Sequence, residues 1–98
     1  MSLPVILRPE ADGDLQIIHD DFEQVRPGLG HHFISKVRQA LIQIELMPEL
    51  YGTVWRDIRA VRLRQFNYVV YYVIFVDRTE VLAIMHGSRH ASAWRSRG

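Results

Sequence analysis

The sequence contains no cysteine, which excludes disulfide bonds and thiolate chemistry and is compatible with a reducing compartment. Its longest apolar run, residues 69–76, is far shorter than the roughly 20 apolar residues that a membrane-spanning helix needs. Arg8 and the acidic residues after it are not typical of a secretory signal peptide. These absences predict a cytoplasmic protein that has no membrane partner.

Lysine is almost absent as well, because Lys36 is the single lysine among twelve basic residues. The charge is also uneven along the chain: residues 1–50 carry four basic and eight acidic side chains, whereas residues 51–98 carry eight basic and three acidic ones. The planar guanidinium of arginine suits two-pronged contact with phosphate or carboxylate. The C-terminal half is therefore expected either to meet an anionic partner, nucleic acid or an acidic protein segment, or to present a solvated basic face.

What the sequence does contain is typical of one folded domain. Hydrophobic residues make up 48% of the chain and charged residues 23%, which argues against disorder. A chain of 98 residues can bury one modest core. No repeat, low-complexity tract or linker divides it, so residues 1–98 are predicted to form a single domain.

Two amphipathic helices are predicted after a short strand at residues 3–8. Pro9 suits the first position of a helix, and the acids just after it suit the positive end of the helix dipole. A break at residues 26–28 separates the two helices, which form an antiparallel hairpin, and Pro48 ends the second. Apolar residues spaced by three or four mark the faces expected to be buried: Ala11, Leu15, Ile18, Phe22 and Val25, then Phe33, Val37, Ala40, Leu41, Ile44 and Met47.

After residue 52 the apolar spacing changes to two, which is typical of β-strands. Short strands are expected on either side of a turn at Asp57, with alternation continuing to Phe66. Residues 68–76 are β-branched and aromatic, as in a central strand covered on both faces, and a turn at residues 77–80 leads into a returning strand at residues 81–86. The predicted fold class is α+β: an N-terminal strand, an antiparallel helical hairpin, then a mainly antiparallel sheet, in the order β-α-α-β-β-β-β.

Five short motifs follow one another along nearly the whole chain. They are Leu7-Arg8-Pro9-Glu10-Ala11 with Asp14-Leu15; Arg26-Pro27-Gly28-Leu29-Gly30 followed by Phe33; Met47-Pro48-Glu49-Leu50-Tyr51; Arg59 to Tyr68 with Val70-Tyr71-Tyr72; and Met85-His86-Gly87-Ser88-Arg89-His90 followed by Trp94. No single motif is specific, whereas the ordered set resembles the RelE/ParE toxin superfamily, and its ParE branch more closely. Asn67 stands where that family often has proline.

The resemblance implies the toxin of a type II toxin–antitoxin pair, silenced by a cognate antitoxin whose extended C-terminal part wraps around it. ParE-like members inhibit DNA gyrase by direct binding, whereas RelE-like members cut mRNA within the ribosome. No cofactor is implied, and DNA would be contacted only indirectly, through the antitoxin. A third alternative is a degenerate toxin that serves only as a partner or co-repressor of its antitoxin.

RNA cleavage through the 2′-OH needs a base, cations for the charge on phosphorus, and a proton for the leaving oxygen. Val69 stands where the similar ribonucleases usually have arginine, and Trp94, which cannot transfer protons, lies near the position of their C-terminal tyrosine. Direct gyrase inhibition is therefore the favoured hypothesis, and enzymatic activity stays open. If the chain is a ribonuclease, its catalytic candidates are Arg62, Arg64, His86 and Arg89, with His90 as a further acid or base.

The predicted binding residues fall into two groups. Arg62 and Arg64 are predicted to share one strand face and to bind the antitoxin, a solvated face being the alternative. Val5, on a strand expected at a sheet edge, is predicted to pair with an antitoxin strand. Because the resemblance to ParE proteins implies a C-terminal segment important for toxicity, the expected target contacts are Arg89, Trp94 and Arg95, and Trp94 is also expected to pack the tail onto the sheet.

Other clusters have plainer interpretations. His86, at the end of an apolar strand, is more often a packed, hydrogen-bonded residue than a catalyst. Neither the neighbours His31 and His32, which point in different directions on a helix, nor His86 with His90 has a third ligand nearby in sequence, so no metal site is predicted. A solvated helix face accounts for the acids Asp20, Asp21 and Glu23.

Overall fold

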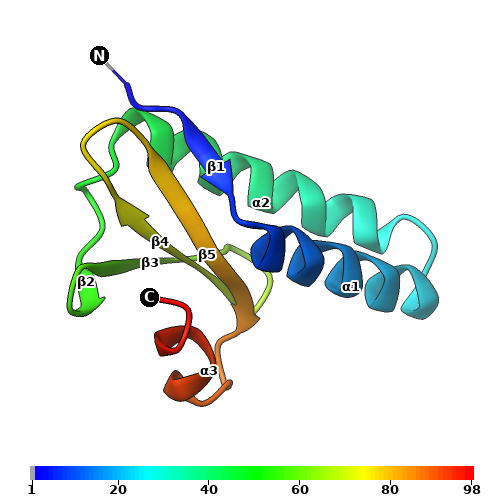
Figure 1. Ribbon diagram of the computed structural model, residues 1–98. Helices are drawn as coiled ribbons and strands as arrows, with labels where there is room; N and C mark the ends of the chain where they lie inside the picture. The colour runs from blue at the N-terminus through cyan, green and yellow to red at the C-terminus, as the bar shows by residue number, and fades with distance from the viewer. Residues whose placement is uncertain (1) are drawn as a thin grey trace.

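The computed structural model describes residues 2–98 and shows a five-stranded sheet with two long helices on one face and a short helix on the other (Figure 1). The predicted α+β class and the order β-α-α-β-β-β-β are confirmed, and the short terminal helix is an addition to that order. Within residues 2–98, no helix combines the length and the apolar character that a membrane crossing requires. The elements are β1 (Val5–Leu7), α1 (Pro9–Val25), α2 (Leu29–Leu46), β2 (Thr53–Trp55), β3 (Ile58–Arg62), β4 (Tyr68–Ile74), β5 (Thr79–His86) and α3 (Ala91–Arg95).

The strands lie in the order β1-β5-β4-β3-β2, with β1 parallel to β5 and every other neighbouring pair antiparallel. The expectation that the N-terminal strand forms a sheet edge is confirmed. The Pro4 carbonyl accepts from the Thr79 N–H, and the Arg8 N–H donates to the Val81 carbonyl, so the intervening Val5 amide faces away from β5 by alternation. The outer side of β1 therefore presents backbone N–H and C=O groups that do not pair with β5.

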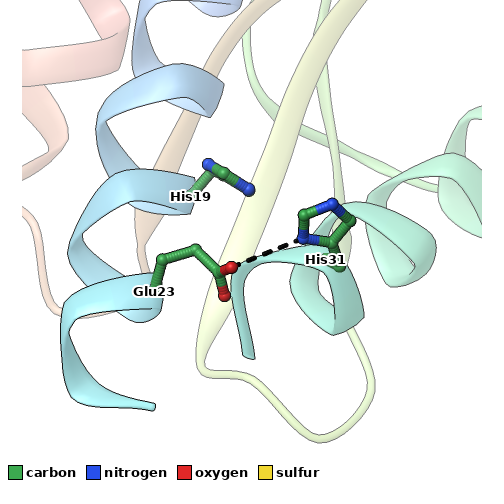
Figure 2. A group of neighbouring side chains, drawn as sticks. All are labelled: His19, Glu23 and His31. Atoms are coloured by element: carbon green, nitrogen blue, oxygen red, sulfur yellow. Dashed lines mark ion pairs between the residues drawn. The ribbon is translucent and has the colours of Figure 1, made fainter. Parts of the chain in front are cut away.

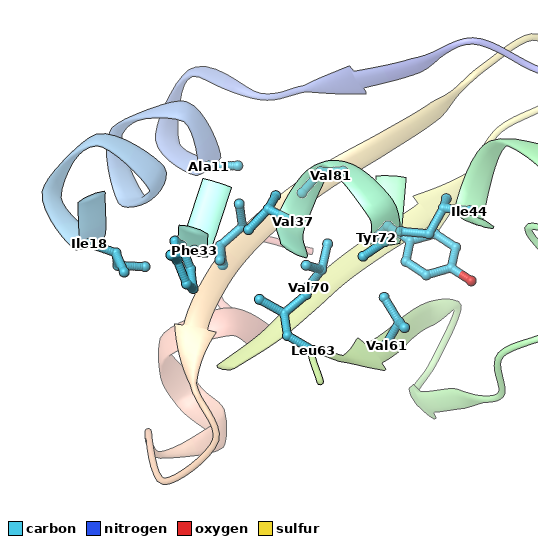
Figure 3. Close-up of a cluster of buried hydrophobic side chains, with 12 residues drawn as sticks. Ala11, Ile18, Phe33, Val37, Ile44, Val61, Leu63, Val70, Tyr72 and Val81 are labelled. Carbon is cyan, nitrogen blue, oxygen red and sulfur yellow. The ribbon is translucent and has the colours of Figure 1, made fainter. Parts of the chain in front are cut away.

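The helical hairpin packs on the sheet around Phe33 (Figure 3). The ring centroid of this fully buried residue lies 5.2–5.3 Å from the centroids of Phe22, Phe66 and Tyr68. Most residues of the two predicted apolar helix faces contribute to this cluster. Val25 and Met47 do not, being 75% and 52% exposed, because each stands at the C-terminal end or cap of its helix, where the helical period no longer decides which way a side chain points.

The second face of the sheet is covered by α3, as the two-sided burial predicted for β4 requires. Trp94 is 7% exposed, and its ring is stacked on Tyr71 with 4.5 Å between centroids and 12° between planes. Tyr72 lies in the other cluster, beneath the helices, so the two tyrosines occupy opposite faces as alternation predicts. The expected packing of the C-terminal tail through Trp94 is confirmed.

Three strand boundaries differ from the prediction. β3 ends at Arg62 instead of continuing to Phe66, since the chain turns sharply at Gln65, whose φ is 72°. β4 ends at Ile74, and Val76 stands 97% exposed in the following turn. Residues 79 and 80, predicted in that turn, begin β5 because β1 pairs with them. That pairing joins segments more than 70 residues apart, so no local pattern contains it.

An ion-pair network fastens this edge of the sheet. Arg8 donates to the Glu80 carboxylate at 2.7 Å, and Arg78 donates to its other oxygen. The hydrogen bond from Arg8 and, to a smaller extent, the one from Arg78 lower the pKa of Glu80 from its ordinary value of 4.5. A carboxyl whose pKa is lowered by folding contributes stability that is present above its unfolded pKa and is lost as the pH falls through the folded pKa.

Glu80→Gln is therefore expected to lower the free energy of unfolding at pH 7 and to weaken its decline below about pH 4.5. Urea unfolding at neutral pH and at successively lower pH values measures both effects. Glu45→Gln, at an exposed position of α2, is the matched control. An acid dependence in Glu80→Gln equal to that of the wild type would contradict the prediction.

Candidate functional site

The segment that leaves α2 is fastened to the sheet by two side chains. The Tyr72 hydroxyl donates to the Pro48 carbonyl at 2.6 Å, and the Arg59 guanidinium donates to the Tyr51 carbonyl at 2.6 Å. Burial raises the pKa of Tyr72 to about 12, so its hydroxyl remains a proton donor at neutral pH. Side chains of β3 and β4 thus hold the Met-Pro-Glu-Leu-Tyr motif in place by bonding to two of its backbone carbonyls.

A groove of about 710 Å³ lies between α2 and the end of β3. Arg62 and Arg64 both line it, as does Lys36 from α2. The prediction that the two arginines share a strand face is wrong, because Arg62 is the last residue of β3 and Arg64 lies in the turn beyond it. Five mainly apolar side chains and two glutamines complete the lining: Ala40, Ile42, Tyr51, Val61 and Leu63, with Gln39 and Gln43. The groove therefore combines an apolar lining with three cationic side chains.

Next to this groove, the segment from the end of α2 to β2 exposes several large apolar side chains. Each is about half exposed or more, which is unusual for so many large apolar residues within one short segment. They are Ile42, Leu46, Met47, Leu50 and Val54. Such a surface is suited to contact with an apolar part of another protein.

A smaller depression of about 340 Å³ lies between α1 and the end of β5. His86 and Arg89 line it together with Tyr68, Asp14 and Asp21. The His86 ring packs edge-on against Tyr68 at 5.2 Å, and its Nδ1 accepts the Ser88 backbone N–H at 3.1 Å. His86 is thus packed and hydrogen-bonded, in agreement with its plainer interpretation.

The four ribonuclease candidates are divided between these two surfaces. Arg62 donates to the Asn67 side chain at 2.6 Å, and its guanidinium lies 2.7 Å from the place a Cβ of Gly87 would occupy, next to His86. Arg64 lines only the larger groove. Burial, and secondarily the charge of Asp21, raises the pKa of Tyr68, so this tyrosine offers no base at neutral pH.

The short helix α3 places basic side chains on the surface beyond β5. Arg89 and Arg95 are exposed, and the Arg95 guanidinium lies 5.3 Å from the Trp55 ring centroid and 5.4 Å from that of Trp94. Arg56 covers Trp55 at 4.2 Å, so β2 and α3 together form a basic, aromatic surface. Sequence reasoning missed Trp55 and Arg56, because only the folded sheet brings them beside α3.

His90, a candidate acid or base, begins this helix. Its Nδ1 accepts the Ser92 backbone N–H at 3.2 Å, which caps the first turn of α3. The residue therefore has a structural role at the helix start.

Residues 5–91 match the family described as the ParE toxin of the type II toxin–antitoxin system parDE. The chain belongs to the ParE toxin family. This family is the toxin side of type II toxin–antitoxin pairs, so the protein has a cognate antitoxin as its partner. The predicted resemblance to the RelE/ParE superfamily, closer to ParE, is confirmed.

Solved structures agree with the family at the level of the fold. The ParE-family chain is similar to a chromosomal ParDE toxin–antitoxin system from P. aeruginosa, with a TM-score of 0.77 and 12% identity over 87% of this chain and 96% of that one. It is also similar to a double mutant of E. coli toxin RelE in the free state, with a TM-score of 0.63 and 13% identity over 99% of this chain and 94% of that one. No curated protein matches the sequence.

Trp94→Ala is expected to lower the free energy of unfolding by about 3–5 kcal/mol, because it removes a buried indole and leaves a cavity. Amide hydrogen exchange in residues 91–95 should accelerate more than exchange in β4. Trp94→Phe retains a ring over Tyr71 and should lose less stability. Urea unfolding and hydrogen exchange measure these effects, and equal exchange rates in Trp94→Ala and the wild type would show that the indole does not anchor α3.

Proposed function

We propose that this ParE toxin inhibits DNA gyrase by direct binding through its C-terminal surface, without catalysing a reaction. The observation that carries the proposal is the arrangement around α3. Arg89 and Arg95 are exposed, whereas Trp94 is buried and fixes the helix on the sheet. Among the three predicted contact residues, the two arginines therefore touch the target and Trp94 positions them.

The chemistry around His86 supports protein binding over RNA cleavage. Val69, which replaces the arginine of the similar ribonucleases, is buried against the α3 face and provides no cation. Asp21 adds an exposed carboxylate to the depression that contains His86 and Arg89, whereas Asp14 there is paired with Arg97. Carboxylates repel a phosphate backbone, so this depression is poorly suited to RNA.

A ribosome-dependent endoribonuclease is the second candidate, because Arg62 lies beside Gly87 and thus near His86. A degenerate toxin that acts only as antitoxin partner or co-repressor is the third. In each case the protein acts in the cytoplasm and contacts DNA only through the antitoxin. The three candidates differ in what they predict for gyrase, for mRNA and for growth.

The antitoxin is proposed to occupy the groove between α2 and β3 and to pair with β1. Arg62, Arg64 and Lys36 suit acidic side chains of an extended segment, while the apolar lining suits its hydrophobic residues. Val5 lies on the opposite sheet edge, three strand positions from β3 and so roughly 14 Å away across the sheet. An antitoxin that contacts both places must wrap around the toxin.

The first test measures supercoiling by purified gyrase with and without the toxin, beside a ribosome-dependent mRNA cleavage assay. We expect loss of supercoiling with intact mRNA. The double variant Arg89→Glu/Arg95→Glu should weaken inhibition by roughly 10-fold or more, since reversed charges oppose the contact. Arg38→Glu, at an exposed position of α2, is the matched control.

Each other outcome of this assay selects another candidate. Cut mRNA with normal supercoiling would establish the ribonuclease, with Arg62, Arg64, His86 and Arg89 as the residues to substitute. No effect on gyrase, mRNA or growth would leave only the degenerate toxin.

For the antitoxin, Arg62→Glu/Arg64→Glu is expected to raise the dissociation constant of the complex roughly 10-fold or more, mainly through faster dissociation. Val5→Pro should also weaken the complex, because it removes an outward-facing N–H while keeping the bonds from β5 to residues 4 and 8. Surface plasmon resonance against the cognate antitoxin measures both. Unchanged affinity in Val5→Pro, with unchanged stability, would exclude strand pairing at β1.

A further inference from the structure

Two histidines and a glutamate converge where α1 and α2 cross (Figure 2). His19 and Glu23 stand four residues apart on one face of α1, and His31 lies in the first turn of α2. One ligand atom from each residue lies within 4.8 Å of the other two, and His31 Nδ1 is 3.5 Å from the Glu23 carboxylate. None of the three residues lines the groove or the smaller depression.

His19 is held in an orientation that suits a metal ligand. Its Nδ1 is 3.0 Å from the Asp20 carboxylate, which fixes the proton on Nδ1 and leaves a lone pair on Nε2. The Cδ2 edge of the ring, to which Nε2 is bonded, faces Gly30: a Cβ at that position would lie 2.7 Å from Cδ2. Nε2 is thus on the side of the ring that faces α2.

Glu23 is also held in place, by the backbone of α2. The Gly30 N–H donates to one carboxylate oxygen at 2.8 Å, which leaves the other oxygen to face His31. This bond is the main cause that lowers the pKa of Glu23, so the carboxyl is ionised at neutral pH. The helices approach this closely because residue 30 is glycine, since a Cβ there would lie 2.5 Å from the His19 carbonyl oxygen.

We propose that His19, Glu23 and His31 bind a divalent transition-metal ion, Zn²⁺ in the first place, which fastens α1 to α2 at their crossing. Two imidazoles and a carboxylate are a ligand set that zinc accepts, with water completing a tetrahedron. Zinc–ligand bonds of about 2.0–2.1 Å place tetrahedral ligands about 3.3 Å apart. The glutamate–His31 pair already has nearly this separation, and the His31 side chain, 80% exposed, is free to close the rest.

The ligand set includes His31 and not its sequence neighbour His32. His32 points away from the cluster, with Nε2 2.8 Å from the Gln65 side-chain oxygen, so the prediction that His31 and His32 diverge is confirmed. The ligands that the sequence prediction did not find near His31 are His19 and Glu23, which both come from α1, across the interhelical turn. Glu23, interpreted from sequence as part of a solvated face, instead bonds to Gly30 of α2.

The test titrates zinc chloride into the metal-free, purified full-length chain by calorimetry, with Co²⁺ absorption spectra to report tetrahedral coordination. We expect one ion per chain and a rise in the thermal midpoint of roughly 10–20 °C at a zinc concentration 100 times the dissociation constant. His31→Gln and Glu23→Gln should each weaken binding roughly 10- to 100-fold. His32→Gln, at the adjacent exposed position, is the matched control and should bind as the wild type does.

Circular dichroism of each variant checks that the fold is intact, which the high exposure of His31 leads us to expect for His31→Gln. The proposal is overturned if the wild type binds no zinc, or if His31→Gln binds it as tightly as the wild type. It is equally overturned if His32→Gln weakens binding as much as His31→Gln, because the ion would then occupy another set of histidines.

Discussion

The two-sided burial of β4 and β5 is the constraint on which the rest of this structure depends. Both strands are apolar on both faces, so a single layer of helices cannot cover the sheet. The helical hairpin covers one face through Phe33 and its aromatic neighbours. The other face is covered by the five residues of α3, and a helix this short stays in place through tertiary contacts.

Trp94 supplies one of these contacts, and the C-terminal Arg97 supplies another. Arg97 bonds to both carboxylate oxygens of Asp14, at 2.6 and 3.2 Å, and also donates to the Leu82 carbonyl. Asp14 in turn accepts the Ile84 N–H. The ion pair therefore satisfies backbone groups of β5 beyond the short strand β1, and it joins the tail to α1 across a sheet edge that would otherwise be open.

This arrangement separates the proposed activities in space. The proposed antitoxin site is the groove between α2 and β3 with the outer edge of β1. The proposed target surface is that of α3, and the proposed metal site lies where α1 meets α2. An antitoxin in the groove does not need to cover Arg95, so its inhibition of the toxin would depend on wrapping farther around the molecule. The smaller depression at His86 adjoins α1 and the end of β5.

The order of the elements up to β5, both long helices, most of their buried positions and the family motifs could be predicted from the sequence. The spacing of apolar residues and the positions of proline and glycine are local signals. Pro9 begins α1 and Phe33 is fully buried, both as these signals predict. Four features could be seen only in the folded protein: the start of β5 at Thr79, the contact of Trp55 with Arg95, the groove position of Arg64, and the approach of His19 to His31. These features depend on pairing and packing between segments distant in sequence, which the period of one segment cannot specify.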